Sequence, residues 1–167
     1  MRKIEKAFVF DFDDTLAFTD AKVKVDYIGR WITGSYDLKP SEFNTHKLRE
    51  GESFDFSDFD KPSFILNGTP TKLIDLAKEV CSEGHSVFIL TARTNCVASA
   101  IAEFLALHGV VASEVHCVGS SEGTDIAKAK RKVLLSIIEN FDRVWFFDDD
   151  DRNIALASNL NCKAKKV

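Results

Sequence analysis

Three short apolar runs in the chain end abruptly in polar residues that can carry chemistry. The first, AFVF at residues 7–10, stops at DFDDT, and the second, VWFF at residues 144–147, stops at four successive aspartates. The third, SVFIL at residues 86–90, stops at Thr91. Such runs are typical of buried parallel strands. Because ligands bind at the carboxyl ends of the strands in an open α/β sheet, the three polar ends are expected to lie together.

Apolar residues elsewhere repeat at helical spacing. One helix is predicted from Thr69 to Gly84, with Thr69 as its N-cap, Pro70 at its first position and Gly84 as its stop. The other predicted elements are helices over residues 95–108, 125–140 and 153–160, and strands over residues 114–118 and 163–167. Strands that alternate with helices through short connections predict an α/β fold, a doubly wound parallel sheet with right-handed crossovers.

Residues 18–69 lack this periodicity and are interpreted as an insertion within a single domain that spans residues 1–167. In the insertion, residues 22–27 alternate polar and apolar side chains and residues 29–35 could form a facing strand, which favours a small β-hairpin. The insertion is either a surface loop anchored by its aromatic rings or a cap over the site. A long loop between catalytic strands is more often functional than idle, which favours the cap or flap.

Composition narrows the class of protein. A chain of this length buries roughly 70% of its unfolded surface, and 45% of its 167 residues are hydrophobic. The net charge of −4 gives no global attraction to nucleic acid or to anionic membranes. The four cysteines lack metal-ligand spacing, no apolar run approaches the ~20 residues of a membrane span, and the N-terminus turns acidic too early for a signal peptide. A cytoplasmic protein without a membrane partner is expected, and the sequence makes no prediction of its oligomeric state.

The aspartates at 11, 13 and 14 and those at 148–151 need a positive partner. Like charges so close together are unfavourable unless a cation or a basic side chain neutralises them, and Mg²⁺ is the obvious cation for carboxylates. Either cluster alone could be a solvated turn with a helix N-cap. Two clusters after apolar runs, together with the strand ending in Thr91, favour a catalytic site.

Four segments resemble, in order, the four motifs of the haloacid dehalogenase-like (HAD) hydrolase superfamily. They are DFDDT at residues 11–15, LTAR at residues 90–93, the basic start of the helix predicted over residues 125–140, and FFDDDDRN at residues 146–153. The resemblance implies the three-layer Rossmann-like sandwich of that superfamily and its phosphatase branch with a small cap. The small insertion and the TxR second motif also look like the phosphatase domain of phage polynucleotide kinases.

The resemblance implies roles for the acidic residues. Asp11 corresponds to the nucleophile that forms an aspartyl phosphate, and Asp13 to the general acid and base. The presence of Asp13 implies hydrolysis of phosphate esters rather than dehalogenation. Mg²⁺ would be held by the Asp11 carboxylate, the Asp13 backbone carbonyl and Asp149. Asp149 is preferred to Asp148 because Asp149 and Asn153 fit the family's GDxxxD spacing, which makes Asp148 an outer partner of the ligands.

The other two motifs supply groups for the phosphate. Thr91 would hydrogen-bond the transferring phosphoryl group, and a lysine of the third predicted helix would neutralise charge there and on Asp11. Lys130 is chosen because it precedes inward-facing apolar positions by three and four residues, with Lys128 as the alternative. Arg93 could bind a substrate phosphate through two hydrogen bonds, or it could pair with an acidic loop.

An Mg²⁺-dependent phosphomonoesterase is the function that these residues predict. A phosphotransferase such as a mutase uses the same motifs, and a non-catalytic module that binds metal or a phosphorylated partner would keep the same fold. The expected partner is a phosphorylated small molecule or a nucleic acid end.

The insertion is the only guide to the substrate. Because it is too slight to seal a chamber, a preference for nucleotides or 3′-phosphorylated polynucleotide ends over sugar phosphates is expected. Cations and stacking rings in it suit this class; they are Lys22, Lys24, Arg30, Trp31, Tyr36, Lys39 and Lys47. The acidic stretch at residues 50–60 argues against a continuous basic surface that could bind the phosphates of a nucleic acid backbone. The alternative is a hairpin whose Trp31 and Tyr27 merely pack on the domain.

Overall fold

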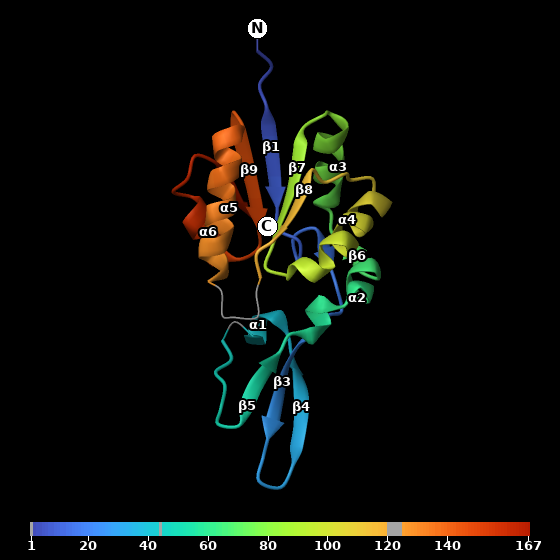
Figure 1. Cartoon of the computed structure of the whole chain (residues 1–167), viewed down its shortest axis with the longest axis vertical. Coiled ribbons are helices and arrows are strands. Elements are labelled where there is room, and N and C mark those ends of the chain that lie inside the picture. Colours follow the sequence, from blue (N-terminus) through green and yellow to red (C-terminus); the bar gives the residue numbers. More distant parts are fainter. Residues whose placement is uncertain (1, 44, 120–124) are drawn as a thin grey trace.

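The predicted strands form one five-stranded parallel sheet in the computed structural model, which describes residues 2–43, 45–119 and 125–167. Its strand order is β10-β9-β1-β7-β8, and every neighbouring pair is parallel. Figure 1 shows β9, β1, β7 and β8 side by side. The strands are β1 (Lys6–Phe10), β7 (Ser86–Thr91), β8 (Glu114–Cys117), β9 (Arg143–Asp148) and β10 (Lys163–Lys166). The predicted α/β class with a parallel sheet is therefore confirmed.

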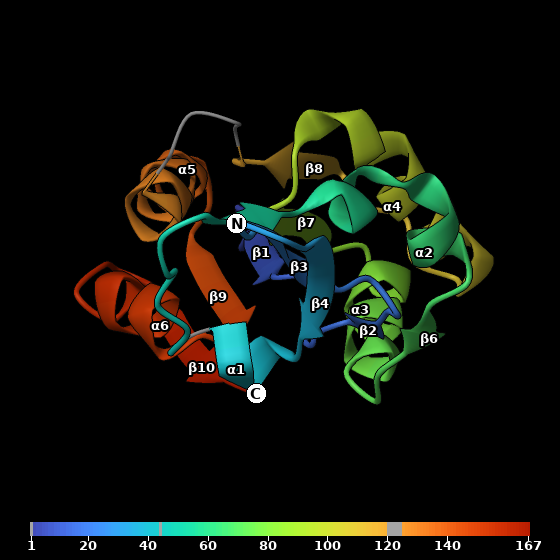
Figure 2. The ribbon, with the colours of Figure 1, turned by 90° about the horizontal axis from the view of Figure 1, so that it is seen from below.

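Helices cover both faces of this sheet, because successive side chains of a buried strand point to opposite faces. Ala7 and Val9 of β1 belong to the core shared with α5 and α6, whereas Phe8 and Phe10 belong to the core shared with α3 and α4. Figure 2 shows α5 and α6 to one side of the sheet and α3 and α4 to the other. The bounds are α3 (Ile74–Ser82), η2 (Asn95–Val97), α4 (Ala98–Leu107), α5 (Ile126–Asn140) and α6 (Asp151–Ala157).

None of the helices in the described part of the chain combines the length and the apolar character needed to cross a membrane.

The central strand β1 lies between the two strands whose ends carry the other polar motifs. Phe10 is level with Ile89 of β7 on one side and with Phe147 of β9 on the other. The residues that follow Phe10, Ile89 and Phe147 therefore emerge at one edge of the sheet. From β1 the later strands continue outward on both sides, β7 and β8 on one side and β9 and β10 on the other. Open α/β sheets bind ligands at such a switch point.

The prediction of a helix with Thr69 as its N-cap is wrong by four residues, because the N-cap is Leu73. Thr69 and Pro70 form the short strand β6, which pairs antiparallel with β2 (Ala17–Phe18), and α3 begins only at Ile74. The local preference of Thr69 for a helix N-cap is overridden by its pairing with Phe18. This pairing lies where the insertion leaves the main domain and returns to it. We call the pair of β2 and β6 the neck of the insertion. Thr71 connects this neck to the first motif, since its hydroxyl donates to the Thr15 carbonyl at 2.6 Å.

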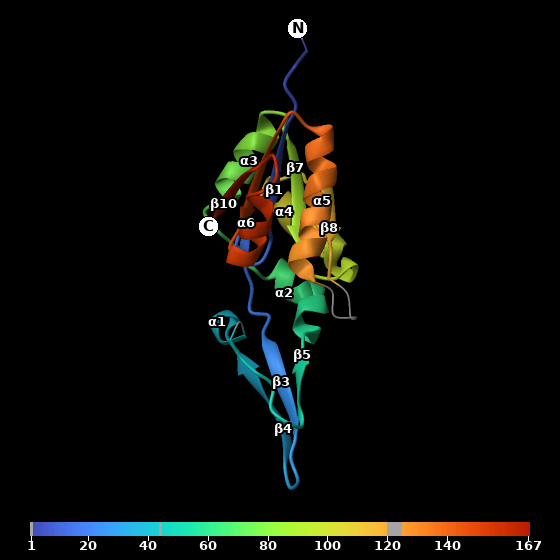
Figure 3. The same ribbon diagram turned by 90° about the vertical axis from the view of Figure 1, so that its left-hand side faces the viewer.

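Between the neck strands the chain builds a second, antiparallel sheet of three strands in the order β4-β3-β5. Its strands are β3 (Val23–Ile28), β4 (Thr33–Leu38) and β5 (Glu52–Asp55), and the short helices of this segment are α1 (Pro40–Phe43), η1 (Ser57–Asp60) and α2 (Pro62–Leu66). The predicted hairpin is present, but residues 29–32 form its turn instead of the start of a strand. Figure 3 shows this sheet projecting beyond the carboxyl ends of the parallel strands.

The inserted sheet has its own small apolar cluster. Buried Val23, Val25 and Leu38 pack against half-buried aromatic rings of the same segment. These rings are Phe43, Phe54 and Phe59. The segment is therefore more ordered than its irregular sequence pattern predicts.

Candidate active site

The first motif is held in a tight turn directly after β1. The backbone N–H of Asp11 donates to the Phe147 carbonyl at 2.8 Å, which fixes Asp11 against β9. The Phe12 carbonyl then accepts the N–H groups of residues 15–17, and Asp14 adopts a left-handed conformation with φ of 60°. Aspartate tolerates this conformation better than most residues. The turn keeps Asp11 and Asp13 at the edge of the sheet.

Lys130 reaches this edge from the first turns of α5. Its ammonium donates to Asp11 and to Asp148, each at 2.8 Å, and only 2% of the residue is exposed. Asn153 of α6 also donates to Asp148, at 2.9 Å. Lys128, the alternative lysine, is exposed and lies 3.9 Å from Asp125 instead. The structure thus brings Lys130, and not Lys128, to the predicted nucleophile.

Burial and charge together set the protonation of this cluster. Burial alone would lower the pKa of Lys130, but the attraction of Asp11 and Asp148 outweighs it and the pKa is raised. Burial raises the pKa of the Asp11 carboxyl well above its usual range, with Lys130 opposing this shift and Asp148 adding to it. A divalent cation beside Asp11 would favour the ionised carboxylate that nucleophilic attack requires.

The carboxylates at the edge form a donor set that fits such a cation. Asp11, Asp148 and Asp149 each place a carboxylate oxygen within 4.8 Å of the others. Carboxylate oxygens are the ligands that Mg²⁺ prefers in proteins. When all three are ionised, the carboxylates carry more negative charge than the single ammonium of Lys130 balances, and a divalent ion would balance the excess.

The two aspartates of the fourth motif differ in how fully they are already bonded. Asp148 is completely buried; one oxygen accepts from Lys130 and Asn153, and the other accepts the Asp150 N–H at 2.9 Å. Asp149 is only half-buried and accepts a long hydrogen bond of 3.5 Å from Thr15. Asp149 therefore has more lone pairs available for a metal than Asp148 has.

Arg93 is paired with a carboxylate of the site. Thr91, which precedes it at the end of β7, is buried, and its hydroxyl accepts the Arg93 N–H at 3.2 Å. The Arg93 guanidinium is also buried and binds both oxygens of Asp13, at 2.9 and 2.7 Å. Of the two roles that the sequence left open for Arg93, the structure shows the pairing with a carboxylate, and that carboxylate is the predicted general acid.

Sequence reasoning missed several contacts of the site. Thr15 donates to Asp11 at 3.0 Å, and the final position of DFDDT was the available signal for it. Arg93 also donates to the Phe59 carbonyl at 2.7 Å and to the Thr19 hydroxyl at 3.4 Å. A backbone carbonyl from an insertion leaves no trace in a sequence pattern, so the contact with Phe59 could not have been predicted.

The predicted nucleotide-binding residues of the insertion are spread over its length. Lys24 lies 3.7 Å from the buried carboxylate of Asp58, which also accepts the Lys22 N–H at 3.1 Å. Trp31 lies in the hairpin turn, 85% exposed, with the Arg30 guanidinium 5.3 Å from its ring centroid. The alternative that Trp31 packs on the domain is therefore wrong.

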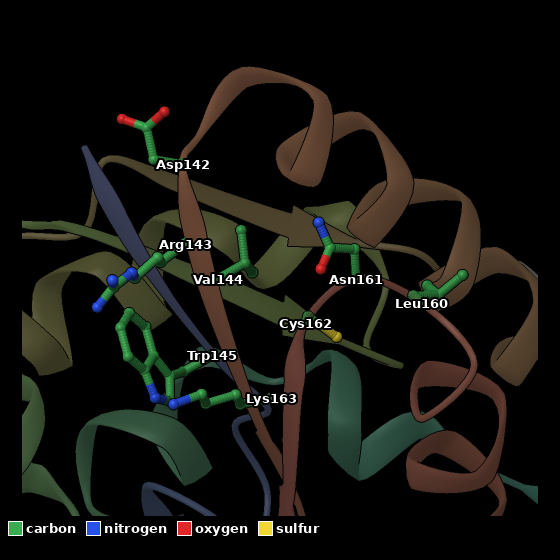
Figure 4. Close-up of a pocket in the computed structure, with 8 residues that line it drawn as sticks. All are labelled: Asp142, Arg143, Val144, Trp145, Leu160, Asn161, Cys162 and Lys163. Carbon is green, nitrogen blue, oxygen red and sulfur yellow. The ribbon is translucent and has the colours of Figure 1, made fainter. Parts of the chain in front are cut away.

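A depression of about 430 Å³ lies away from the acidic edge, at the start of β9 and β10. Figure 4 shows Arg143, Trp145 and Lys163 around it. The Lys163 ammonium sits 5.6 Å from the centre of the Trp145 ring, and Asp142 already accepts the Glu5 N–H at 2.9 Å. The residues of the acidic motifs lie at the opposite ends of these strands, so the depression is separate from the candidate site.

No family model matches the chain, and no curated protein is significantly similar to it. Among solved structures, a chain of the Pnkp1/Rnl/Hen1 RNA repair complex aligns with a TM-score of 0.66 at 16% identity, covering 98% of this chain and 42% of that one. A haloacid dehalogenase-like family protein from Streptococcus pneumoniae aligns with a TM-score of 0.56 at 17% identity, covering 96% and 83%.

A third structure of the same fold is D,D-heptose 1,7-bisphosphate phosphatase from B. bronchiseptica, complexed with magnesium and phosphate. It aligns with a TM-score of 0.53 at 11% identity, covering 95% of this chain and 78% of that one. The present chain spans less than half the length of the RNA repair chains that it matches. These likenesses confirm the HAD-like fold expected from the four motifs.

Proposed function

We propose that this chain is an Mg²⁺-dependent phosphomonoesterase that acts through an aspartyl phosphate on Asp11. The observation that carries the proposal is the setting of the Asp11 carboxylate, whose two oxygens accept hydrogen bonds from Lys130 at 2.8 Å and Thr15 at 3.0 Å. These contacts hold the carboxylate in place at the edge of the sheet, and the neighbouring carboxylates of Asp148 and Asp149 offer a cation site.

Each reaction step uses a group already at this edge. A carboxylate oxygen of Asp11 attacks phosphorus while the bond to the leaving oxygen breaks, and Asp13, which starts protonated, donates its proton to that oxygen. Asp13 then takes a proton from water, whose oxygen attacks phosphorus and breaks the bond to Asp11. The products are an alcohol and inorganic phosphate, and Asp11 and Asp13 return to their starting states.

Lys130 and Thr91 stabilise the phosphoryl group during both steps. Lys130 keeps its proton because its pKa is raised, so it offers a fixed positive charge. The Asp11 carboxylate, the Asp13 backbone carbonyl and Asp149 would hold Mg²⁺, which supplies charge neutralisation for the phosphoryl oxygens. Asp148 would orient Lys130, to which it is bonded at 2.8 Å.

We further propose that the substrate is a nucleotide or a 3′-phosphorylated polynucleotide end, with residues 18–69 acting as a partial flap. The exposed pair of Arg30 and Trp31 offers a cation and a stacking surface. A likeness in fold to a chain of an RNA repair complex supports the same class. Phosphate release from a panel of nucleotides, 3′-phosphorylated oligonucleotides and sugar phosphates tests this, and a sugar phosphate with a kcat/KM about tenfold above the others would refute it.

The activity itself is tested with p-nitrophenyl phosphate in the presence of Mg²⁺ or of a chelator. Turnover is expected only with Mg²⁺, and Asp11→Asn should abolish it because an amide cannot form the acyl phosphate. Asp151→Asn is the matched control, since the Asp151 side chain is exposed and pairs with Lys166 at 2.9 Å. Turnover by Asp11→Asn within about tenfold of the parent would overturn the nucleophile, and no turnover by the parent would overturn the function.

A further inference from the structure

Arg93 joins three parts of the molecule that are distant in sequence. Its guanidinium binds both oxygens of Asp13, and the same group donates to the Phe59 carbonyl at 2.7 Å and to the Thr19 hydroxyl at 3.4 Å. The guanidinium also lies over the Phe59 ring, 4.9 Å from its centroid. Thus Arg93 connects the loop after β7, the first motif and helix η1 of the insertion.

These contacts leave the guanidinium little capacity for a substrate. Arginine has five N–H donors, and four hydrogen bonds are already made within the protein. The side chain is 2% exposed, so an incoming phosphate would have to displace buried partners. Phosphate binding by Arg93 is therefore disfavoured.

We propose that Arg93 is a positioning residue that orients the carboxyl group of Asp13 and ties this orientation to the docking of η1. The proposal rests on the function proposed above, in which Asp13 protonates the leaving oxygen. A bidentate contact fixes both the place and the plane of a carboxylate. Because Phe59 holds the other side of the guanidinium, undocking of η1 would release Arg93 and with it the acid.

A second contact joins the same two segments without reaching Asp13. The Thr94 hydroxyl donates to Asp60 of η1 at 2.7 Å. Two side-by-side contacts between η1 and the loop after β7 make a defined docking surface for the insertion. Of the two, only the Arg93 contact reaches the acid.

The catalytic part of the inference is tested by comparing leaving groups. p-Nitrophenolate leaves with little protonation, whereas an alkoxide needs a well-placed acid. Arg93→Lys keeps the charge but cannot make the planar two-bond contact, so kcat/KM for an alkyl phosphate should fall about 100-fold, and that for p-nitrophenyl phosphate less than about tenfold. Equal loss with both esters would overturn the positioning role, because a phosphate-binding or purely structural arginine affects both alike.

A double-mutant comparison identifies the group through which Arg93 acts. If Arg93 works through Asp13, adding Arg93→Lys to Asp13→Asn should change kcat/KM for p-nitrophenyl phosphate less than about twofold. Additive losses would refute the coupling. Phe59→Leu removes the ring over Arg93 and should reproduce the preference for the good leaving group in weaker form, whereas Phe56→Leu, an exposed ring of the same segment, should not.

The structural part of the inference does not depend on activity. Backbone amides of residues 57–66 should exchange with deuterium about tenfold faster in Arg93→Lys than in the parent, while those of β1 and β7 stay unchanged. Unchanged exchange in residues 57–66 would overturn the link to the insertion. If the parent hydrolyses neither ester, the proposed function and the acid-positioning role both fail, and the exchange measurement still decides whether Arg93 clamps η1.

Discussion

The ammonium of Lys130 lies 2.8 Å from a carboxylate oxygen of Asp11, across 119 residues of sequence, and both side chains are buried. The same ammonium binds Asp148 at 2.8 Å. One buried cation therefore serves two buried anions from neighbouring strands, and the stability of the sheet edge depends on it.

Removing this cation should destabilise the fold as well as the site. Lys130→Met leaves two buried carboxylates without a counter-charge, and loss of one partner of a buried pair costs about 3–5 kcal/mol. Thermal unfolding in the presence of a chelator measures the effect. Lys128→Met is the matched control, because Lys128 is exposed, and equal Tm values for the two variants would contradict the expected role of Lys130.

Metal binding should depend on Asp149 more than on its neighbours. Because Asp149 is the less fully bonded aspartate, Asp149→Ala should weaken Mg²⁺ affinity by more than the roughly 10–100-fold typical of an outer partner. The rise in Tm with Mg²⁺ concentration reports this affinity without any assay of activity. Asp151→Ala should respond to Mg²⁺ as the parent does.

Asp148 provides the converse case. Asp148→Asn should lower the Tm even without Mg²⁺, because Lys130 loses an anionic partner at 2.8 Å. If Asp148→Asn abolished the response to Mg²⁺ while Asp149→Ala kept it, the assignment of the two aspartates would have to be exchanged.

The buried carboxylate of Asp58 should stabilise the insertion locally. Asp58 accepts the Lys22 N–H at 3.1 Å and the Lys61 ammonium at 3.3 Å, and so it joins the start of the inserted sheet to η1. Asp58→Ala should cost about 1–3 kcal/mol and should speed deuterium exchange in residues 20–25 and 57–66. Asp26→Ala, at an exposed position of β3, should leave exchange unchanged; equal behaviour of the two variants would show that Asp58 has no such role.

The cysteines should differ in reactivity. Burial raises the pKa of the Cys117 thiol to about 11, and the thiolate is the reactive form, so at pH 8 only about one Cys117 in a thousand is ionised. Alkylation followed by mass spectrometry should therefore find exposed Cys96 modified well before Cys117. The difference should vanish in urea, and its absence under native conditions would contradict the packing around β8.

The parts of the fold that follow from local sequence patterns could be predicted from the sequence. Apolar runs located β1, β7 and β9, and the polar residues after them located the site, because parallel strands end at one edge. Helical spacing favoured Lys130 over Lys128 for the lysine that the resemblance implied, since position on a helix decides which side chain faces the sheet.

Contacts decided by tertiary structure escaped prediction. Thr69 and Pro70 look locally like a helix start, yet pairing with β2 makes them a strand. The strand β5 is four residues long and has a weak pattern, so only its pairing with β3 defines it. The sequence left open whether Arg93 binds a substrate phosphate or pairs with a carboxylate. Its orientation depends on the position of Phe59 in the insertion, which the sequence pattern does not show.

The neck has a consequence for how proteins of this architecture can diversify. Phe18 pairs with Thr69, so the inserted segment departs and returns at adjacent points, and its length adds little to the entropy of closing the loop. A segment attached in this way can be lengthened, shortened or exchanged without shifting the register of the parallel strands. The tip of the inserted sheet can therefore vary on its own, whereas η1 is constrained because its Phe59 carbonyl accepts a hydrogen bond from Arg93.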